Sequence, residues 1–249
     1  MTEDQQDNAD LNDQHLRDHL EISQLAGSLA HEIKNPLSVI RMNMDLLAED
    51  LAEASNPREH RLSSKVQVVQ SQCQRLQTLL DDFLKFVRVR EMDMKAGSLN
   101  EQLERVLDFL APKAVQAEIA VNRYLDPDAP SIMMDAARLY AALMNLVLNA
   151  IEATPAGGTI EVFTRLTSTG VALDLIDNGC GMQEQMAIHM FDPFFTTKEN
   201  GSGLGLPIAR RIIEAHGGRI AVQTVVGRGT QFTLEFPTPA RLTSGSDQH

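Results

Sequence analysis

Two long stretches of apolar residues at helical spacing constrain the fold of the first third of this chain. Between residues 22 and 51 apolar side chains recur every three or four positions, and the same spacing resumes between residues 62 and 87. This spacing places the apolar residues in one stripe along a helix. Asn56 and Pro57 separate the two stripes and favour a turn. The sequence therefore predicts an antiparallel hairpin of two long helices with coiled-coil packing.

The predicted hairpin also predicts an oligomeric state. The second stripe runs through Leu62, Val66, Val69, Cys73 and Leu76, and its alternating steps of four and three are heptad spacing. Two helices bury only one stripe each and cannot enclose a core. Association of two copies into a four-helix bundle is the simplest remedy, so we expect a homodimer.

The rest of the chain mixes helices and strands without strict β-α-β alternation, which favours an α+β domain. Ser98 and Glu101 form a capping-box pattern at its start, and Gly217 and Gly218 are typical of a helix C-cap. The periodicity predicts helices near 99–117, 135–153 and 204–216, and strands near 119–125, 159–166, 171–177, 219–225 and 230–236.

These patterns divide the chain into segments. The first residues are acidic, polar and without periodicity, which is typical of disorder. The predicted segments are a disordered N-terminus at 1–14, the dimerising helical hairpin at 15–90, a linker at 91–97, an α/β-sandwich domain at 98–237 and a disordered tail at 238–249.

Composition excludes several classes of partner. The chain has 34 acidic and 22 basic residues, a formal net charge of −12, and no cluster of lysine and arginine. Nucleic acid and anionic membranes are therefore not expected partners. No segment approaches the ~20 uninterrupted apolar residues of a membrane helix, and the polar N-terminus does not have the pattern of a secretory signal. The two cysteines, without an export signal, favour the cytoplasm.

A histidine with an acidic neighbour lies on the first predicted helix, outside its apolar stripe. His31 follows Leu29 by two positions, which turns it about 200° from the apolar face and toward solvent. Glu32 can accept the Nδ1 proton and leave the Nε2 lone pair free for attack. Asn35 lies one turn further along, and Pro36 removes a backbone donor, which predicts a bend beside the histidine. A lone surface histidine is usually only solvated, but these neighbours make His31 a candidate nucleophile.

Two later segments carry residues suited to a nucleotide. Asn145 and Asn149 share one face of a predicted helix, where amide oxygens suit hydrated magnesium; hydrogen-bonded core asparagines are the alternative. Asp177 ends a predicted strand and precedes Gly179 and Gly181. Its carboxylate can accept the exocyclic amino group of adenine, and the glycines let the backbone approach the ring. Alone, this second pattern fits a tight turn equally well.

A phenylalanine-rich stretch and a glycine-rich stretch follow. The residues from Phe191 to Lys198 are aperiodic and contain a proline, which predicts a hinged flap with an apolar anchor or a small core cluster under a loop. Gly201, Gly203 and Gly205 precede a predicted helix. Glycines at this place expose backbone N–H groups to a phosphate. The spacing fits neither a Walker loop nor a Rossmann fingerprint.

The order of these segments resembles one family. A histidine box, an asparagine box, Asp-x-Gly-x-Gly, a phenylalanine box and Gly-x-Gly-x-Gly occur in the sequence and spacing of the sensor histidine kinases of two-component systems. The segment from Gly227 to Thr230 resembles the last glycine segment of the family. The resemblance covers about residues 20–237, and the box at His31 is similar to that of the nitrogen-regulation type.

The resemblance implies a role for each matching residue. His31 corresponds to the phosphoacceptor, Glu32 to its acid–base partner, and Asn35 to the residue associated with dephosphorylating the regulator. Lys198 lies in the lid near the phosphates. The implied nucleotide-binding positions are Asn145, Asn149, Asp177, Gly179, Gly181, Lys198, Gly201, Gly203, Leu204, Gly205 and Thr230, with Asn149 as the magnesium ligand.

The resemblance further implies an activity. The chain is expected to be a protein-histidine kinase that uses ATP and Mg²⁺, autophosphorylates on His31, and passes the phosphoryl group to an aspartate on the receiver domain of a response regulator. Regulator phosphatase activity is a second expectation, and a separate sensor protein is a further candidate partner. Two alternatives remain open: a GHKL-type nucleotide-binding scaffold, and a serine/threonine kinase without histidine phosphorylation.

Overall fold

The computed structural model describes residues 33–51, 56–87, 92–198 and 201–238. The chain divides into two compact units. The first is Met1–Arg88 with Lys198–Ser202, and the second is Val89–Thr197 with Gly203–His249. No helix in the described ranges is both long enough and apolar enough to cross a membrane.

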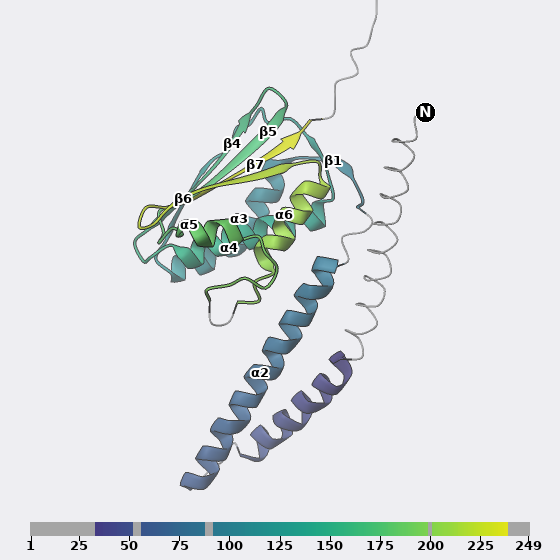
Figure 1. Cartoon of the computed structure of the whole chain (residues 1–249), viewed down its shortest axis with the longest axis vertical. Helices are drawn as coiled ribbons and strands as arrows, with labels where there is room; N and C mark the ends of the chain where they lie inside the picture. Colours follow the sequence, from purple (N-terminus) through teal and green to yellow (C-terminus); the bar gives the residue numbers. More distant parts are fainter. Residues whose placement is uncertain (1–32, 52–55, 88–91, 199–200, 239–249) are drawn as a thin grey trace, which may run out of the picture. The chain divides into compact units, whose positions relative to one another are not determined.

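The first unit contains the predicted helical hairpin (Figure 1). One helix covers residues 33–50, and α2 covers Pro57–Val87. The side-chain oxygen of Asn56 accepts hydrogen bonds from the N–H groups of Arg58 and Glu59, both at 3.0 Å. Asn56 therefore caps α2, and Pro57 occupies the first helical position, where its missing N–H costs nothing.

Polar contacts between the two helices establish that they run antiparallel. Arg41 donates to the side chain of Gln77 at 3.2 Å, and Gln70 donates to Asp45 at 2.7 Å. The residue numbers of the bonded partners on α2 therefore fall as those on the first helix rise. An ion pair between Lys34 and Asp81 follows the same order.

The heptad stripe of α2 is only partly covered. Cys73 is buried, and Val66 and Leu80 are half-buried. Val69 and Leu76, at the alternate heptad positions, are 39% and 54% exposed. One row of the stripe is thus covered and the other still faces outward.

The second unit is built on a five-stranded sheet with the order β2-β4-β5-β7-β6. β2 pairs in parallel with β4, and the other neighbours pair antiparallel. The elements of this unit are β1 (Lys95–Gly97), α3 (Leu99–Gln116), β2 (Ala120–Tyr124), β3 (Ile132–Met134), α4 (Ala136–Ala153), β4 (Thr159–Leu166), β5 (Gly170–Asp177), α5 (Glu184–His189), α6 (Gly205–Ala215), β6 (Arg219–Val225) and β7 (Gly229–Pro237).

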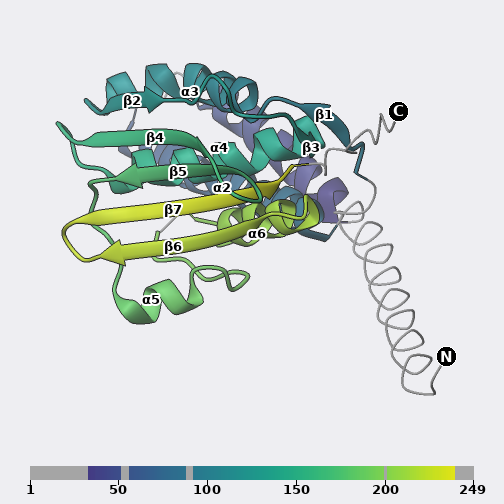
Figure 2. The same ribbon diagram turned by 90° about the horizontal axis from the view of Figure 1, so that it is seen from above.

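Helices α3, α4 and α6 lie together along one face of this sheet (Figure 2). Alternate residues of the strands point into the layer between helices and sheet, as period-two side-chain alternation requires. The predicted α+β sandwich is confirmed. The most deeply buried large side chains include Leu139, Leu143 and Leu146 of α4, Ile213 of α6, and Ile160, Leu173 and Leu234 of the sheet.

Three short elements were not predicted from the sequence. β1 pairs antiparallel with β3 in a separate two-stranded sheet, so Lys95–Gly97, which the sequence assigned to the linker, is paired with the second unit. α5 lies between the strand predicted to end at residue 177 and the helix predicted to begin near residue 204, where the periodicity predicts no element. Elements of this length carry too few residues for a periodic pattern.

Candidate nucleotide site

Asp177 organises the end of β5. Its side chain is buried, with an exposed fraction of 4%. Its Oδ1 accepts hydrogen bonds from the backbone N–H of Gly179 at 2.9 Å and of Thr230 at 3.2 Å. Three of the predicted nucleotide-binding residues, from β5, from β7 and from the loop that follows β5, therefore meet at one carboxylate.

The environment of Asp177 has two opposing effects on its charge. Burial raises the pKa of this carboxyl above its ordinary value, and the hydrogen bonds from Gly179 and Thr230 offset only part of that effect. Both bonds go to Oδ1, which leaves Oδ2 as the atom available to a further donor. A buried carboxylate with one committed oxygen suits recognition of an amino group.

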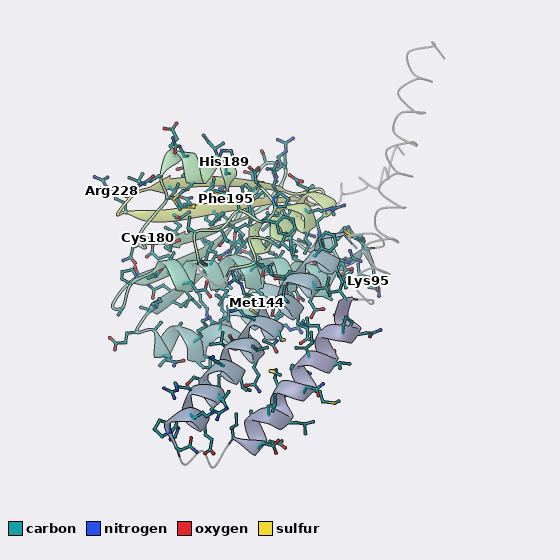
Figure 3. The ribbon with its side chains drawn as sticks, turned by 60° about the horizontal axis from the view of Figure 1, so that its bottom comes forward. Lys95, Met144, Cys180, His189, Phe195 and Arg228 are labelled. Carbon is teal, nitrogen blue, oxygen red and sulfur yellow. The ribbon has the colours of Figure 1, made fainter. Side chains whose placement is uncertain are left out.

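The loop after Asp177 is held from several sides. The N–H of Cys180 donates to Ala153 at the end of α4 at 3.1 Å, and its carbonyl accepts from Gly227 at 2.8 Å. The N–H of Met182 donates to the hydroxyl of Thr224 at 2.9 Å. Figure 3 accordingly shows Cys180 and Arg228 at the same end of the unit. The loop is thus a fixed edge between α4 and the β6–β7 turn.

Gly181 is required by this packing. Its φ is +62°, and a Cβ there would overlap the carbonyl of Val225. At Gly179 a Cβ would overlap the carbonyl of Ala153. The sequence predicted that these glycines admit a ligand. In the structure the missing Cβ atoms leave room for two backbone carbonyls of the chain itself, those of Ala153 and Val225.

The two asparagines of α4 lie on one face of the helix, as their spacing predicts. Both are half-buried. The Nδ2 of Asn145 donates to the carbonyl of Gly205 at 3.2 Å, which joins α4 to the first residue of α6. This bond uses the nitrogen, so Oδ1 is the atom of Asn145 that a cation or donor would meet.

The glycine segment before α6 is folded against the phenylalanine box. Phe194 donates its N–H to the carbonyl of Gly203 at 3.0 Å. Gly203 has a φ of +67°, and a Cβ there would overlap the backbone of Phe194. Leu204 precedes α6, is 0% exposed, and makes no side-chain cap bond. Leu204 therefore anchors the start of the helix by packing.

The phenylalanine box is not a core cluster. Phe194 is 59% exposed, Phe195 is also exposed, and Phe191 is half-buried beneath the guanidinium of Arg210, 5.3 Å from its ring centre. Phe195 also faces the ring of His189, with the ring centres 5.8 Å apart (Figure 3). Phe191 is therefore the one partly covered ring of the three, and the hinged flap stays a prediction.

The predicted site residues fall into distinct groups. Asp177, Gly179 and Thr230 form one group, and Asn145 and Gly205 form another. Lys198 and Gly201 belong to the first unit, where the N–H of Gly201 donates to the carbonyl of Lys198 at 3.2 Å.

The histidine box falls only partly within the described residues. His31 and Glu32 lie outside the described residues, and so does the predicted bend beside them. Asn35 is exposed on the first helix, and Pro36 lies within that helix.

Sequence reasoning missed the part played by His216. The sequence pattern indicates only that His216 precedes the glycine pair at the end of a helix, and the structure places it against the start of α4 through Asp135. No local pattern links residues so distant in the chain.

These features define an α/β sandwich with a candidate nucleotide site, in one chain with a helical hairpin. Residues 134–240 match the family described as histidine kinase-, DNA gyrase B- and HSP90-like ATPase. Residues 21–91 match the His Kinase A phospho-acceptor domain.

Individual relatives agree with these matches. The chain is 34% identical over 217 residues to the signal transduction histidine-protein kinase AtoS of Escherichia coli K12, covering 87% of this chain and 35% of AtoS. The nucleotide-free catalytic domain of histidine kinase ThkA is 35% identical, with a TM-score of 0.55 over 59% of this chain and 100% of that domain. ThkA in complex with the response regulator TrrA is 28% identical, with a TM-score of 0.64 over 90% of this chain and 64% of ThkA.

Full-length ShkA in complex with AMPPNP is 28% identical, with a TM-score of 0.69 over 87% of this chain and 46% of ShkA. The chain belongs to the sensor histidine kinases of two-component systems. It spans about a third of the length of AtoS.

Proposed function

We propose that this chain is an ATP-dependent protein-histidine kinase. The Nε2 of His31 attacks the γ-phosphorus of ATP, a nitrogen–phosphorus bond forms, and the bond from the γ-phosphorus to the oxygen of ADP breaks. The phosphoryl group then passes to a carboxylate of an aspartate on a separate response regulator. The observation that carries the proposal is that one chain combines a phospho-acceptor match at residues 21–91 with a nucleotide-binding match at residues 134–240.

The second unit holds the nucleotide in this proposal. Asp177 accepts the amino group of adenine through Oδ2, and backbone N–H groups near Gly203, Leu204 and Gly205 face the phosphates. Asn145 carries an amide, which cannot take a proton from water. We therefore expect bound ATP to persist until the histidine arrives, with positioning supplying most of the catalysis.

The residues of α4 fit a magnesium ion. Asn149 and Asn145 present half-buried amide groups on one helical face, and oxygen donors with retained water suit Mg²⁺. Asn149 is the proposed ligand. The ion would neutralise charge on the phosphate oxygens when bound.

The histidine box performs two steps in this proposal. Glu32 accepts the Nδ1 proton as His31 attacks, and Asn35 holds water for removing the phosphoryl group from the regulator. We expect Asn35→Ala to slow regulator dephosphorylation while autophosphorylation continues. Equal loss of both activities would contradict a separate role for Asn35.

The uncovered heptad row supports a dimer. Val69 and Leu76 face outward at regular spacing, and a second copy would cover them in a four-helix bundle. The ThkA–TrrA complex supports a response regulator as a partner, and we propose that its receiver domain is what this chain meets. We propose a cytoplasmic location, in keeping with two unpaired cysteines, Cys73 and Cys180.

A labelling experiment separates this proposal from its alternatives. After incubation with γ-labelled ATP and Mg²⁺, we expect a protein-bound label that is lost in acid and kept in base, as a phosphorus–nitrogen bond on histidine requires. A label stable to acid would favour a serine/threonine kinase. Nucleotide binding without any label would favour a binding scaffold.

A further inference from the structure

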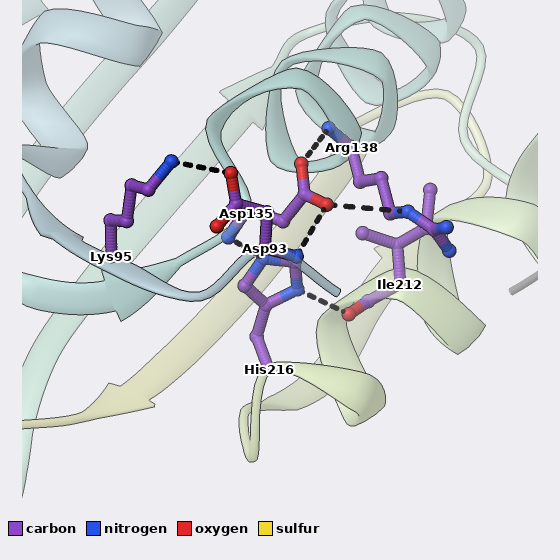
Figure 4. A network of polar contacts seen from close by, with 6 residues as sticks. All are labelled: Asp93, Lys95, Asp135, Arg138, Ile212 and His216. Carbon is purple, nitrogen blue, oxygen red and sulfur yellow. Dashed lines mark hydrogen bonds and ion pairs between the residues drawn. The ribbon is translucent and has the colours of Figure 1, made fainter. Parts of the chain in front are cut away.

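His216 closes α6 and uses both of its ring nitrogens. Its side chain is 5% exposed. Nδ1 lies 2.7 Å from the carbonyl oxygen of Ile212, and Nε2 lies 3.0 Å from the backbone nitrogen of Asp135 (Figure 4). The backbone N–H of Asp135 is a donor, so Nε2 must accept, and the ring proton lies on Nδ1 and is donated to Ile212. The imidazole is held in one tautomer by two elements.

The partner of His216 is the residue that starts α4. The carboxylate of Asp135 accepts from the N–H of Arg138 at 3.1 Å, which caps the helix. It also accepts from the N–H of Asp93 at 3.3 Å. Asp135 thus holds the first turn of α4 with its side chain and His216 with its backbone. The imidazole joins the beginning of α4 to the end of α6.

A second bond joins the middle of α4 to the other end of α6. Asn145 of α4 donates to the carbonyl of Gly205, the first residue of α6. At 1.5 Å per residue, Asp135 and Asn145 are about 15 Å apart along α4, and Gly205 and His216 are about 16 Å apart along α6. The two spans match, so α6 runs antiparallel to the first half of α4 and is bonded to it at both of its own ends. Two such bonds set both the register and the crossing angle of α6 against α4, whereas a single bond would leave α6 able to pivot about it.

We propose that His216 is a positioning residue for the nucleotide site. This inference rests on the proposed function, in which α4 carries Asn145 and Asn149 and α6 begins at the phosphate loop. His216 does not touch the nucleotide in this account. It holds α6 in the register that brings Gly205 to Asn145, and so keeps the glycine segment and the asparagine face aligned for one ligand.

Two amide substitutions separate the bond to Asp135 from the bond within α6. In His216→Asn the shorter amide can still donate to Ile212 and cannot reach Asp135. In His216→Gln the longer amide can present its oxygen where Nε2 lies. Ser98→Ala is the control, because it removes the cap bond from Glu101 to Ser98 at the start of α3 and leaves α4 and α6 alone. It lowers stability without altering their register.

The measurement is the dissociation constant of a fluorescent ATP analogue for the full chain with Mg²⁺, well below the unfolding temperature, with the unfolding midpoint recorded for each variant. We expect His216→Asn to bind about three- to tenfold more weakly, the equivalent of one net hydrogen bond. His216→Gln should bind within about twofold of the parent, and Ser98→Ala should bind like the parent despite its lower midpoint.

Three outcomes would overturn the inference. If His216→Asn binds as tightly as the parent, His216 is only a structural cap. If Ser98→Ala weakens binding as much as His216→Asn does, the effect reports stability rather than register. A parent chain that binds no nucleotide would overturn the proposed function and this inference together, whereas the first two outcomes would overturn the inference alone.

Discussion

Replacing Asp177 by asparagine separates recognition of adenine from folding. An asparagine keeps an acceptor oxygen where Oδ1 lies, so the bonds from Gly179 and Thr230 are retained. It replaces Oδ2, the oxygen that we assign to adenine, by an NH₂ group that donates. In the variant the NH₂ group of asparagine would face the amino group of adenine, and two donors cannot bond to each other. The bonds from Gly179 and Thr230 to the side-chain oxygen stay in place.

The expected effects on stability and on binding differ in sign. The folded-state pKa of Asp177 is raised by burial, so its contribution to stability is present below the ordinary carboxyl pKa and is lost as pH rises through the folded-state pKa. At neutral pH the asparagine variant should be as stable as the parent or more so. Loss of a hydrogen bond to a charged group costs about 1.5–3 kcal/mol, or about 10- to 150-fold in affinity for ATP.

Calorimetric titration with a non-hydrolysable ATP analogue and the corresponding GTP analogue tests this reasoning. Guanine carries an acceptor oxygen where adenine carries its amino group, so Asp177→Asn should lower the preference for ATP over GTP. Asp174→Asn is the matched control, because Asp174 lies on the same strand at an odd spacing and faces the other side of the sheet. It should lose about 1 kcal/mol of stability and bind ATP normally. Unchanged ATP affinity and preference in Asp177→Asn would refute the assignment.

Three further predictions follow from the described residues. Cys180 is exposed and Cys73 is buried, so a thiol reagent should modify Cys180 quickly in the native chain and both cysteines after unfolding. Bound nucleotide should slow the reaction of Cys180, and rapid modification of both cysteines in the native chain would contradict the burial of Cys73. Burial alone would raise the pKa of Asp174, but hydrogen bonds from Thr233 and Arg165 outweigh it and hold the pKa below its usual range, so Asp174 should add stability above the ordinary carboxyl pKa of about 3.9 that is lost as pH falls through the lower folded-state value. The unfolding midpoint of Asp174→Asn should therefore change less steeply with pH in acid than that of the parent, and equal slopes would refute the assignment. Leu76→Glu places a charge in the uncovered heptad row and should give a folded monomer by light scattering, whereas an unchanged dimer would exclude this row as the interface.

Long periodic segments made most of the fold predictable. The stripes of α2, α4 and α6 and the alternation of β4 and β7 each span enough residues for their period to be unambiguous. The ends were predictable where a local chemical signal exists. The N–H of Gly218 donates to Ile213, and the N–H of Gly217 donates to Glu214, the bond pattern that the glycine pair at the end of α6 predicts.

What the sequence did not reveal depends on contacts between distant segments. β1 forms only because β3 lies beside it, and neither strand has enough residues to indicate its period. The bond from Asp135 to His216 joins residues far apart in the chain, and neither residue is unusual in its own neighbourhood. The residue types of the site could be read from the motifs, whereas the way Asp177 gathers Gly179 and Thr230 required the sheet register.

The most direct test of the account is to locate the phosphoryl group. The full chain is incubated with ATP and Mg²⁺, digested under neutral to basic conditions, and analysed by mass spectrometry, alongside His31→Gln and Asp177→Asn. The account predicts one phosphorylated peptide, with the group on His31, absent from His31→Gln and strongly reduced in Asp177→Asn. A phosphoryl group on a serine or threonine, or one that persists in His31→Gln, would contradict it.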